Sequence, residues 1–132
     1  MNNMVKFKEK TDELFYKFDG YSATELELMV EKYVNDKILE YNLDVVLRDV
    51  VLSGSRCRGL EYSASDLDFV VSFLGKERED VLFAILNEDE FDIDGVKVDI
   101  NPIIVEKTGS LDEYLLGVEE YLKELYMQRN AL

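Results

Sequence analysis

Apolar residues recur along this chain with two alternating periods, and the change of period predicts its helices and strands. A helical stripe follows Ser22-Ala23-Thr24-Glu25, which has the form of a capping box, and we expect that helix to end near Asn42. The same spacing predicts a helix over residues 77–87. A second capping box, Ser110-Leu111-Asp112-Glu113, predicts a last helix.

The strands are expected between these helices. Residues 45–53 are rich in valine and end at Gly54, and residues 67–73 are apolar apart from Asp68 and Ser72, so both segments are expected to be buried strands. Residues 91–100 alternate around Asp94-Gly95, a dipeptide that favours a tight hairpin turn. Around residues 13–18 we expect a short helix or strand. The order predicts an α/β (α+β) fold, in which helices pack on a small mixed sheet.

Length and composition are those of one globular domain spanning residues 1–132. Hydrophobic residues make up 47% and charged residues 33%, so the chain has enough apolar side chains for a core. No apolar run approaches the roughly 18 residues that a membrane helix needs, and the start lacks a secretory signal. The single cysteine, Cys57, excludes an intramolecular disulfide, and we expect a cytoplasmic protein.

The net charge of -14 limits the kinds of partner that the protein is expected to bind. Such a field repels phosphate backbones, so nucleic acid is not an expected partner, whereas metal ions and basic proteins are. An oligomer is compatible with the sequence. Because the chain has no histidine, a general base must be another side chain or metal-bound hydroxide, and a zinc site built on imidazole is excluded.

A glycine-serine pair, Gly54-Ser55, directly follows the first predicted strand. Glycine allows a ligand to approach the backbone closely, and a helix beginning at Ser55 would direct its N–H groups toward a phosphate. Arg56 and Arg58 add positive charge beside this pair. Taken alone, the motif also fits an ordinary strand-to-helix turn with solvated arginines.

Two other chemistries for this loop are disfavoured. Gly54 and Gly59 have the spacing of a P-loop, but Leu60-Glu61 stands where Lys-Ser/Thr is required. The flanking arginines are expected to lower the pKa of Cys57, yet no histidine can partner a catalytic thiol. A small packing residue is the better interpretation of Cys57.

Three aspartates form the candidate metal site. Asp66 and Asp68 flank Leu67 where a strand begins, so alternation directs both side chains to one face, with α-carbons about 6.5 to 7 Å apart. Asp99 interrupts the apolar strand pattern around Val98 and Ile100. A charge in that setting is unfavourable unless a metal or partner compensates it. Hard carboxylate oxygens suit Mg²⁺ or Mn²⁺.

Each aspartate also has a simpler explanation. Asp66 alone fits a turn or cap residue, and Asp99 alone fits the polar face of an edge strand. Like charges 4 Å apart repel by about 1 kcal/mol in water and about 4 kcal/mol at a dielectric of 20. Three clustered aspartates therefore destabilise the fold unless magnesium, protonation or solvent reduces this repulsion. A calcium loop from Glu90 is disfavoured, because its twelfth position is Asn101 rather than glutamate.

Together these motifs resemble the DNA polymerase β-like nucleotidyltransferase superfamily. Gly54-Ser55, followed by Ser65-Asp66-Leu67-Asp68 and the later Asp99, has the form of its signature, over roughly residues 45–102. The short length resembles minimal members, including the antitoxins paired with HEPN toxins. Cys57 stands where such relatives often carry alanine, a minor departure.

The resemblance implies a site and a reaction. Gly54 and Ser55 would hold the β- and γ-phosphates of a nucleoside triphosphate, with ATP favoured, and Arg56 or Arg58 would neutralise them. Ser65 would belong to the nucleotide-binding set. Asp66 and Asp68 would bind two magnesium ions, and Asp99 would join the metal that activates the incoming hydroxyl. A hydroxyl would attack the α-phosphate and release pyrophosphate.

Three functions follow as alternatives. The first is an enzyme that transfers a nucleoside monophosphate to a protein or small molecule. The second is an acidic, antitoxin-like protein that neutralises a protein partner with weak or no catalysis. A purely structural domain ranks last, because it leaves the coincidence of three motifs unexplained.

Overall fold

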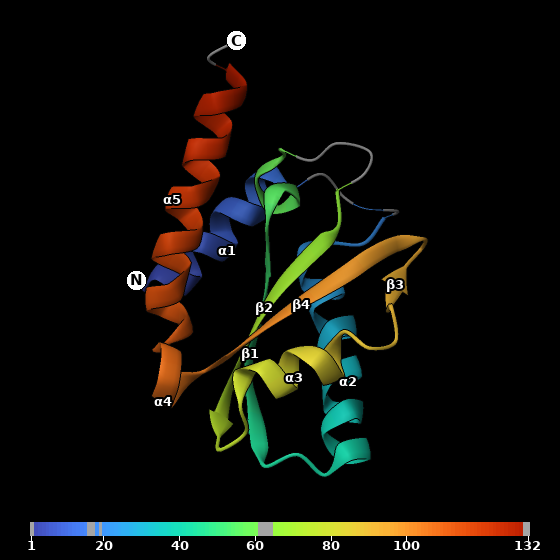
Figure 1. The fold of residues 1–132 in the computed structure, drawn as a ribbon. Helices are drawn as coiled ribbons and strands as arrows, with labels where there is room; N and C mark the ends of the chain where they lie inside the picture. Colours follow the sequence, from blue (N-terminus) through green and yellow to red (C-terminus); the bar gives the residue numbers. More distant parts are fainter. Residues whose placement is uncertain (1, 16–17, 19, 61–64, 131–132) are drawn as a thin grey trace.

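The computed structural model describes residues 2–15, 18, 20–60 and 65–130. Its strands form one sheet in the order β1-β2-β4-β3 (Figure 1). These strands are β1 (Val45–Ser53), β2 (Leu67–Gly75), β3 (Asp92–Ile93) and β4 (Val96–Ile104). The helices are α1 (Asn3–Leu14), α2 (Ala23–Tyr41), the 3-10 helix η1 (Ser55–Arg58), α3 (Glu79–Leu86), α4 (Val105–Thr108) and α5 (Leu111–Asn130).

The predicted mixed sheet is confirmed. β1 pairs antiparallel with β2, and β2 pairs parallel with β4. A parallel pair needs a crossover connection, which α3 and β3 supply. The β3–β4 hairpin turns at Asp94 and Gly95, whose φ angles of 49° and 85° are both positive, as a type I′ turn requires.

β4 is longer than the alternation predicted. It continues past Ile100 to Ile104, because the segment pairs with β2 from Leu67↔Val98 to Phe73↔Ile104. The parallel partner, rather than the hairpin, sets the length of the strand.

The predicted long helices are confirmed, and the first capping box is complete. The Ser22 side chain accepts from the Glu25 N–H, and the Glu25 carboxylate accepts from the Ser22 N–H. At the far end, Asn42 adopts the left-handed conformation that closes a helix. The box at the start of α5 makes the bond from the Glu113 N–H to Ser110 Oγ.

The expectation for the first residues was wrong. The element around residues 13–18 is replaced by α1, a helix that ends at Leu14; residues 16 and 17 lie outside the described part of the chain. α1 begins at the cap Asn2, whose Oδ1 accepts from the Val5 N–H. Phe7 and Thr11, one turn apart, are its buried residues. Packing against α5 and η1 stabilises this helix. The apolar spacing in its sequence is weak and did not predict these contacts.

The helices cover both faces of the sheet. Figure 1 shows α1 and α5 on one side of the strands and α2 on the other. Alternation along β2 directs Leu67, Phe69 and Val71 to one face and Asp68 and Val70 to the other. The C-terminal end of α5 extends beyond the sheet (Figure 1). Within the described residues, no helix combines the length and the apolar character needed to cross a membrane.

Candidate active site

Asp68 and Asp99 occupy neighbouring positions in the sheet. They are register partners on the parallel strands β2 and β4, so both side chains lie on the face that α5 covers. On the other side of Asp68, its register partner is Ser53 of β1, whose hydroxyl donates to the Asp68 carbonyl oxygen over 3.4 Å. The result is a row of side chains across three strands, which we call the acidic row: Ser53, Asp68 and Asp99.

Asp66 joins this row from the residue before β2. A hydrogen bond between the carboxyl groups of Asp66 and Asp99 raises the pKa of Asp66, and partial burial and the charge of Asp99 raise it further. Two carboxyl groups share a hydrogen bond only when one of them holds a proton. The structure therefore brings all three predicted aspartates together.

Asp68 also has a raised pKa. Burial raises its pKa to about 6, and the charges of Asp99 and Asp66 add to the effect, while Arg56 and Lys97 oppose it. Lys97 lies on the same face of β4, with its Nζ 3.4 Å from Asp99 Oδ1. When all three aspartates are ionised, Lys97 and Arg56 supply two positive charges against three negative ones, so the cluster then attracts further positive charge.

The oxygen atoms of the three aspartates are the type of ligand that a hard divalent cation prefers. All of its atoms are carboxylate oxygens, which Mg²⁺ and Mn²⁺ prefer, and like-charge repulsion leaves them poised to accept a cation. Among the described residues, no three acidic groups are arranged around one point as ligands of a single ion. Binding would therefore require side-chain rotations that replace the Asp66–Asp99 hydrogen bond.

Gly54 packs directly against Asp68. Its φ of 78° favours glycine, and an added Cβ would lie 2.9 Å from Asp68 Cβ and closer still to Asp68 Oδ2. The sequence predicted that Gly54 permits a close approach to a ligand. In the structure the group that approaches is the carboxylate of Asp68, and this contact places the loop backbone beside the acidic cluster.

The end of β1 is held from outside the sheet by Glu27 of α2. Its Oε2 accepts from the Leu52 N–H at 2.7 Å, two residues before Gly54. Lys8 of α1 lies 3.6 Å from the same carboxylate. This contact also occupies a donor on an edge strand, and nothing in the local pattern of α2 predicted it.

Ser55, Arg56 and Ser65 gather beside the aspartates. The predicted helix start at Ser55 is a single 3-10 turn, in which the Ser55 hydroxyl lies 3.4 Å from Ser65 Oγ. The Arg56 guanidinium donates to the Ser65 carbonyl oxygen at 2.9 and 3.2 Å. Its charge opposes part of the rise in the pKa of Asp66 and Asp68, so a cation acts on the acidic row.

Arg58 does not belong to this group, and its assignment to the nucleotide site is corrected. Its side chain is buried between η1, α1 and α5, where it forms a 2.8 Å ion pair with Glu119 and donates to Thr11 and to the Phe7 carbonyl oxygen. The guanidinium also lies 4.1 Å from the Phe7 ring centroid. Its donors are thus engaged by the helices, away from the aspartates.

Cys57 is a packing residue, as expected, but the expected direction of its pKa shift was wrong. The side chain is fully buried, and its Sγ donates to the Gly54 carbonyl oxygen at 3.1 Å. Burial raises the thiol pKa to about 12, which outweighs the charge of Arg58. The thiol is therefore not a nucleophile.

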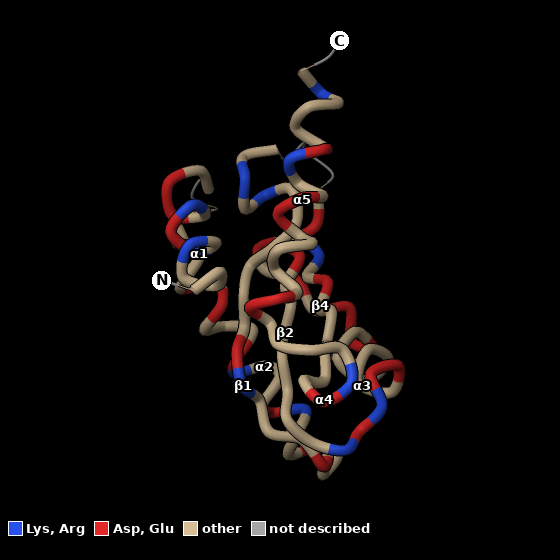
Figure 2. Tube along the Cα trace, turned by 90° about the vertical axis from the view of Figure 1, so that its left-hand side faces the viewer, with Lys and Arg blue, Asp and Glu red and all other residues tan. Residues whose placement is uncertain are grey.

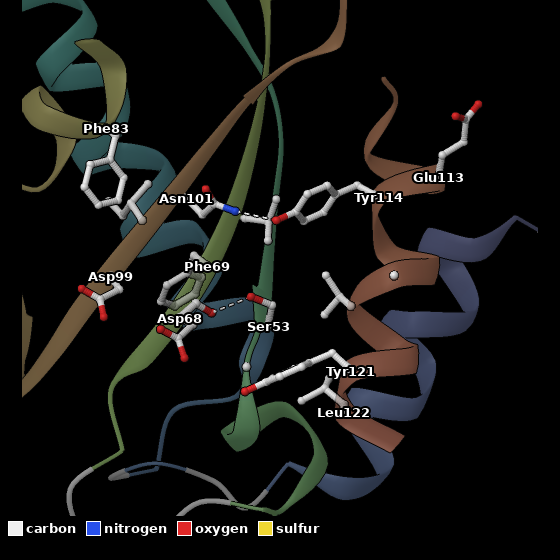
Figure 3. Close-up of a pocket in the computed structure, with 15 residues that line it drawn as sticks. Ser53, Asp68, Phe69, Phe83, Asp99, Asn101, Glu113, Tyr114, Tyr121 and Leu122 are labelled. Atoms are coloured by element: carbon white, nitrogen blue, oxygen red, sulfur yellow. Dashed lines mark hydrogen bonds between the residues drawn. The ribbon is translucent and has the colours of Figure 1, made fainter. Parts of the chain in front are cut away.

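A cleft of about 810 Å³ opens between the sheet and α5, and it is lined by Ser53, Asp68 and Asp99 (Figure 3). Gly54, Asp68 and Asp99 lie along one side of it, and its volume is in the range of small-molecule sites. Tyr114 and Tyr121 extend from α5 toward the strands (Figure 3). These tyrosines were missed, although their spacing of seven residues puts them on one helix face.

Charge over the described part of the molecule is predominantly acidic. Figure 2 shows Asp and Glu distributed over the helices and the sheet, with Lys and Arg scattered among them rather than gathered into one stripe.

The chain matches no protein-family model, no curated protein and no solved structure. Its function must therefore be inferred from its own residues and geometry.

Proposed function

We propose that the protein is a metal-dependent nucleotidyltransferase, which moves a nucleoside monophosphate from a nucleoside triphosphate to a hydroxyl group and releases pyrophosphate. The observation that carries this proposal is the register pairing of Asp68 with Asp99, with the Gly54 backbone against the Asp68 carboxylate. The resemblance to the DNA polymerase β-like superfamily supports it, because the same residues form that signature.

The site residues divide into two groups. Asp66, Asp68 and Asp99 would hold Mg²⁺ or Mn²⁺, and the bound metal would neutralise triphosphate charge and acidify the attacking hydroxyl. Ser55 and Arg56 lie at the Gly54 end of the acidic row, so they would orient the β- and γ-phosphates. The α-phosphate would then lie at Asp68 and Asp99, which line the cleft.

In the reaction, the acceptor oxygen forms a bond to the α-phosphorus. The bond from that phosphorus to the oxygen bridging the α- and β-phosphates breaks, and pyrophosphate leaves. The acceptor proton passes to a carboxylate, for which Asp99 is suited because it is half exposed and faces the cleft. Arg56 compensates charge that accumulates on the leaving group.

A protein or a small molecule suits the acceptor position better than nucleic acid. The net charge of -14 opposes the approach of a polyanionic acceptor. ATP is the favoured donor.

A protein that binds a partner without catalysis is the second candidate. It is favoured by a groove of about 420 Å³ between α1 and α5, with Leu14, Tyr126 and Met127 exposed along it. Exposed apolar side chains that lie together often form protein contacts. This function would not require the acidic row.

The test is label transfer from α-³²P-ATP with Mg²⁺ and a cell extract. Asp66→Ala/Asp68→Ala should abolish transfer, whereas Glu31→Ala/Asp36→Ala, which removes two exposed acidic groups from α2, should retain it. Equal transfer by the wild type and the Asp66→Ala/Asp68→Ala variant would refute the catalytic assignment. No transfer by the wild type, with a partner still bound by both variants, would favour the second candidate.

A further inference from the structure

Two contacts fix α5 over the cleft. Toward one end of the cleft, Asn101 Nδ2 of β4 donates to the Tyr114 hydroxyl at 2.7 Å. Toward the other, Glu119 forms its 2.8 Å ion pair with Arg58, the last residue of η1. α5 therefore runs from the Asn101 end of the cleft toward the loop that begins at Gly54.

The rise of the helix places Tyr121 at the opposite end of the cleft from Tyr114. Tyr121 follows Tyr114 by seven residues, so its α-carbon lies about 10.5 Å farther along the helix axis. Asn101 follows Asp99 by two residues, which is about 6.5 to 7 Å along β4. The rise of α5 exceeds the distance from Asn101 back to the acidic row, and so it carries Tyr121 past the level of Asp99. Figure 3 shows the Tyr121 ring extending from α5 toward the end of β1, where Ser53 lies.

The hydroxyl groups of the two tyrosines differ in their contacts. Tyr114 and Tyr121 both line the cleft. The Tyr114 hydroxyl is held by Asn101, whereas the Tyr121 hydroxyl forms no hydrogen bond to the described residues. Because Tyr121 is 62% exposed, its O–H donor is available to a ligand in the cleft.

The loop after β1 can contact a triphosphate from one side only. The Arg56 guanidinium already donates to the Ser65 carbonyl oxygen, and the Ser55 hydroxyl lies 3.4 Å from Ser65 Oγ. Each phosphate has non-bridging oxygens that point in several directions, so some of them would face away from this loop and toward α5. Tyr121 supplies a hydrogen-bond donor on that side of the cleft.

We propose that the Tyr121 hydroxyl binds the β- and γ-phosphates from the α5 side of the cleft. Its O–H donates to a phosphate oxygen, while Ser55 and Arg56 contact the same phosphates from the loop after β1. Because these two phosphates leave together as pyrophosphate, Tyr121 favours a nucleoside triphosphate over a donor with fewer phosphates. This role rests on the proposed function for the position of the triphosphate, but Tyr121 lies outside the sequence motif that suggested that function.

Calorimetric titration with Mg²⁺-bound ATP and Mg²⁺-bound inorganic triphosphate tests this role. Tyr121→Phe removes only the hydroxyl oxygen and should weaken the binding of both probes by about tenfold, as expected for the loss of one hydrogen bond to a charged group. The factor should be the same for both probes, because the hydroxyl contacts phosphates and not the nucleoside. Tyr121→Ala should show a similar loss, since the ring itself makes no hydrogen bond to phosphate.

Two other tyrosines of α5 are matched controls. Tyr126→Phe removes a hydroxyl from a residue that is 57% exposed and lines the groove between α1 and α5. Tyr114→Phe removes the hydroxyl that Asn101 holds. Both variants should bind the two probes like the wild type. Tyr121→Phe should keep the wild-type melting temperature, because its hydroxyl makes no hydrogen bond to the described residues.

The outcomes separate this role from the proposed function. Unchanged triphosphate affinity in Tyr121→Phe would overturn the role, as would wild-type binding of ATP without triphosphate. A loss confined to ATP, or to Tyr121→Ala, would also overturn it, since the ring rather than the hydroxyl would then contact the ligand. In these cases the proposed function would stand, because label transfer tests it separately. Failure of the wild type to bind either probe would overturn both.

Discussion

The α-carbon of Gly54 lies so close to the carboxylate of Asp68 that no side chain fits between them. An added Cβ would lie 2.9 Å from Asp68 Cβ and 3.0 Å from Asp68 Cγ. The contact joins the loop after β1 to the acidic side chain of β2, and so it couples the two motifs on which the proposed function depends.

Gly54→Ala should destabilise the protein by about 2 to 4 kcal/mol, since backbone strain at positive φ and displacement of Asp68 add. Gly20→Ala is the matched control: its φ is 85°, but its Cβ would meet no atom within 4 Å. It should lose only about 1 kcal/mol. Urea denaturation of both variants measures the difference, and equal losses would show that the Asp68 contact is unimportant.

Removing the charge of Asp68 should stabilise the protein when no metal is present. Its pKa is raised from 3.8 to about 6 by burial and by Asp99 and Asp66, so the folded state disfavours its ionised form. Asp68→Asn should therefore raise stability at pH 7 by about 1 kcal/mol, after allowing for solvent screening. Melting curves with and without Mn²⁺ should show this gain together with loss of metal-dependent stabilisation.

Metal affinity should depend on pH in the acidic range. Because the folded pKa of Asp68 is raised to about 6, protons compete with the cation below that pH. Mn²⁺ affinity should fall about tenfold per pH unit below 6 and reach a plateau above about 7. The metal-free protein should show the opposite trend, losing part of its stability as pH rises from about 4 to 6, because its folded state binds more protons there. A pH-independent affinity between 5 and 7 would exclude Asp68 as a ligand.

Substitutions of the two arginines of η1 should have different effects, with Arg58 needed for stability and Arg56 for nucleotide binding. Arg58→Met breaks the buried ion pair with Glu119 and should destabilise by about 3 kcal/mol, and the double variant Arg58→Met/Glu119→Leu should recover part of the loss. Arg56→Met should change stability by less than about 1 kcal/mol and weaken triphosphate binding. Urea midpoints and calorimetry measure the two effects; a stable Arg58→Met variant would contradict the assigned role.

Cys57 should resist alkylation in the folded protein. Its side chain is fully buried, and its pKa is raised to about 12 by burial. Iodoacetamide at pH 8 should label it only as fast as the protein opens, and immediately in 6 M urea. Mass spectrometry measures the labelled fraction. Rapid labelling without denaturant would indicate that η1 is not packed as described.

Part of the candidate site was predictable from the sequence because it depends on neighbours in the chain. Alternation alone directs Asp66 and Asp68 to one face, and a strand followed by Gly54-Ser55 predicts a backbone turn of special geometry. The Asp94-Gly95 hairpin and the capping box at Ser22 are equally local, and both are confirmed.

The rest was decided by packing between segments that are distant in sequence. Arg56 and Arg58 are indistinguishable in the chain, yet one lies beside the aspartates and the other is buried by Glu119 on α5. Sequence spacing could not predict this, because the direction of a side chain in a one-turn helix depends on what covers it. Tyr121 is missed for the same reason: a helix pattern shows which residues share a face, not what lies opposite.

By itself, the sequence determined the class of the fold, most of its long elements and the chemical character of the acidic residues, since these follow from periodicity and side-chain chemistry over a few residues. Only the tertiary structure decided that β2 and β4 pair in parallel with Asp68 opposite Asp99, and that α5 closes a cleft above them. Strand pairing and helix docking are set by the burial of apolar faces over the whole molecule, which no local segment contains.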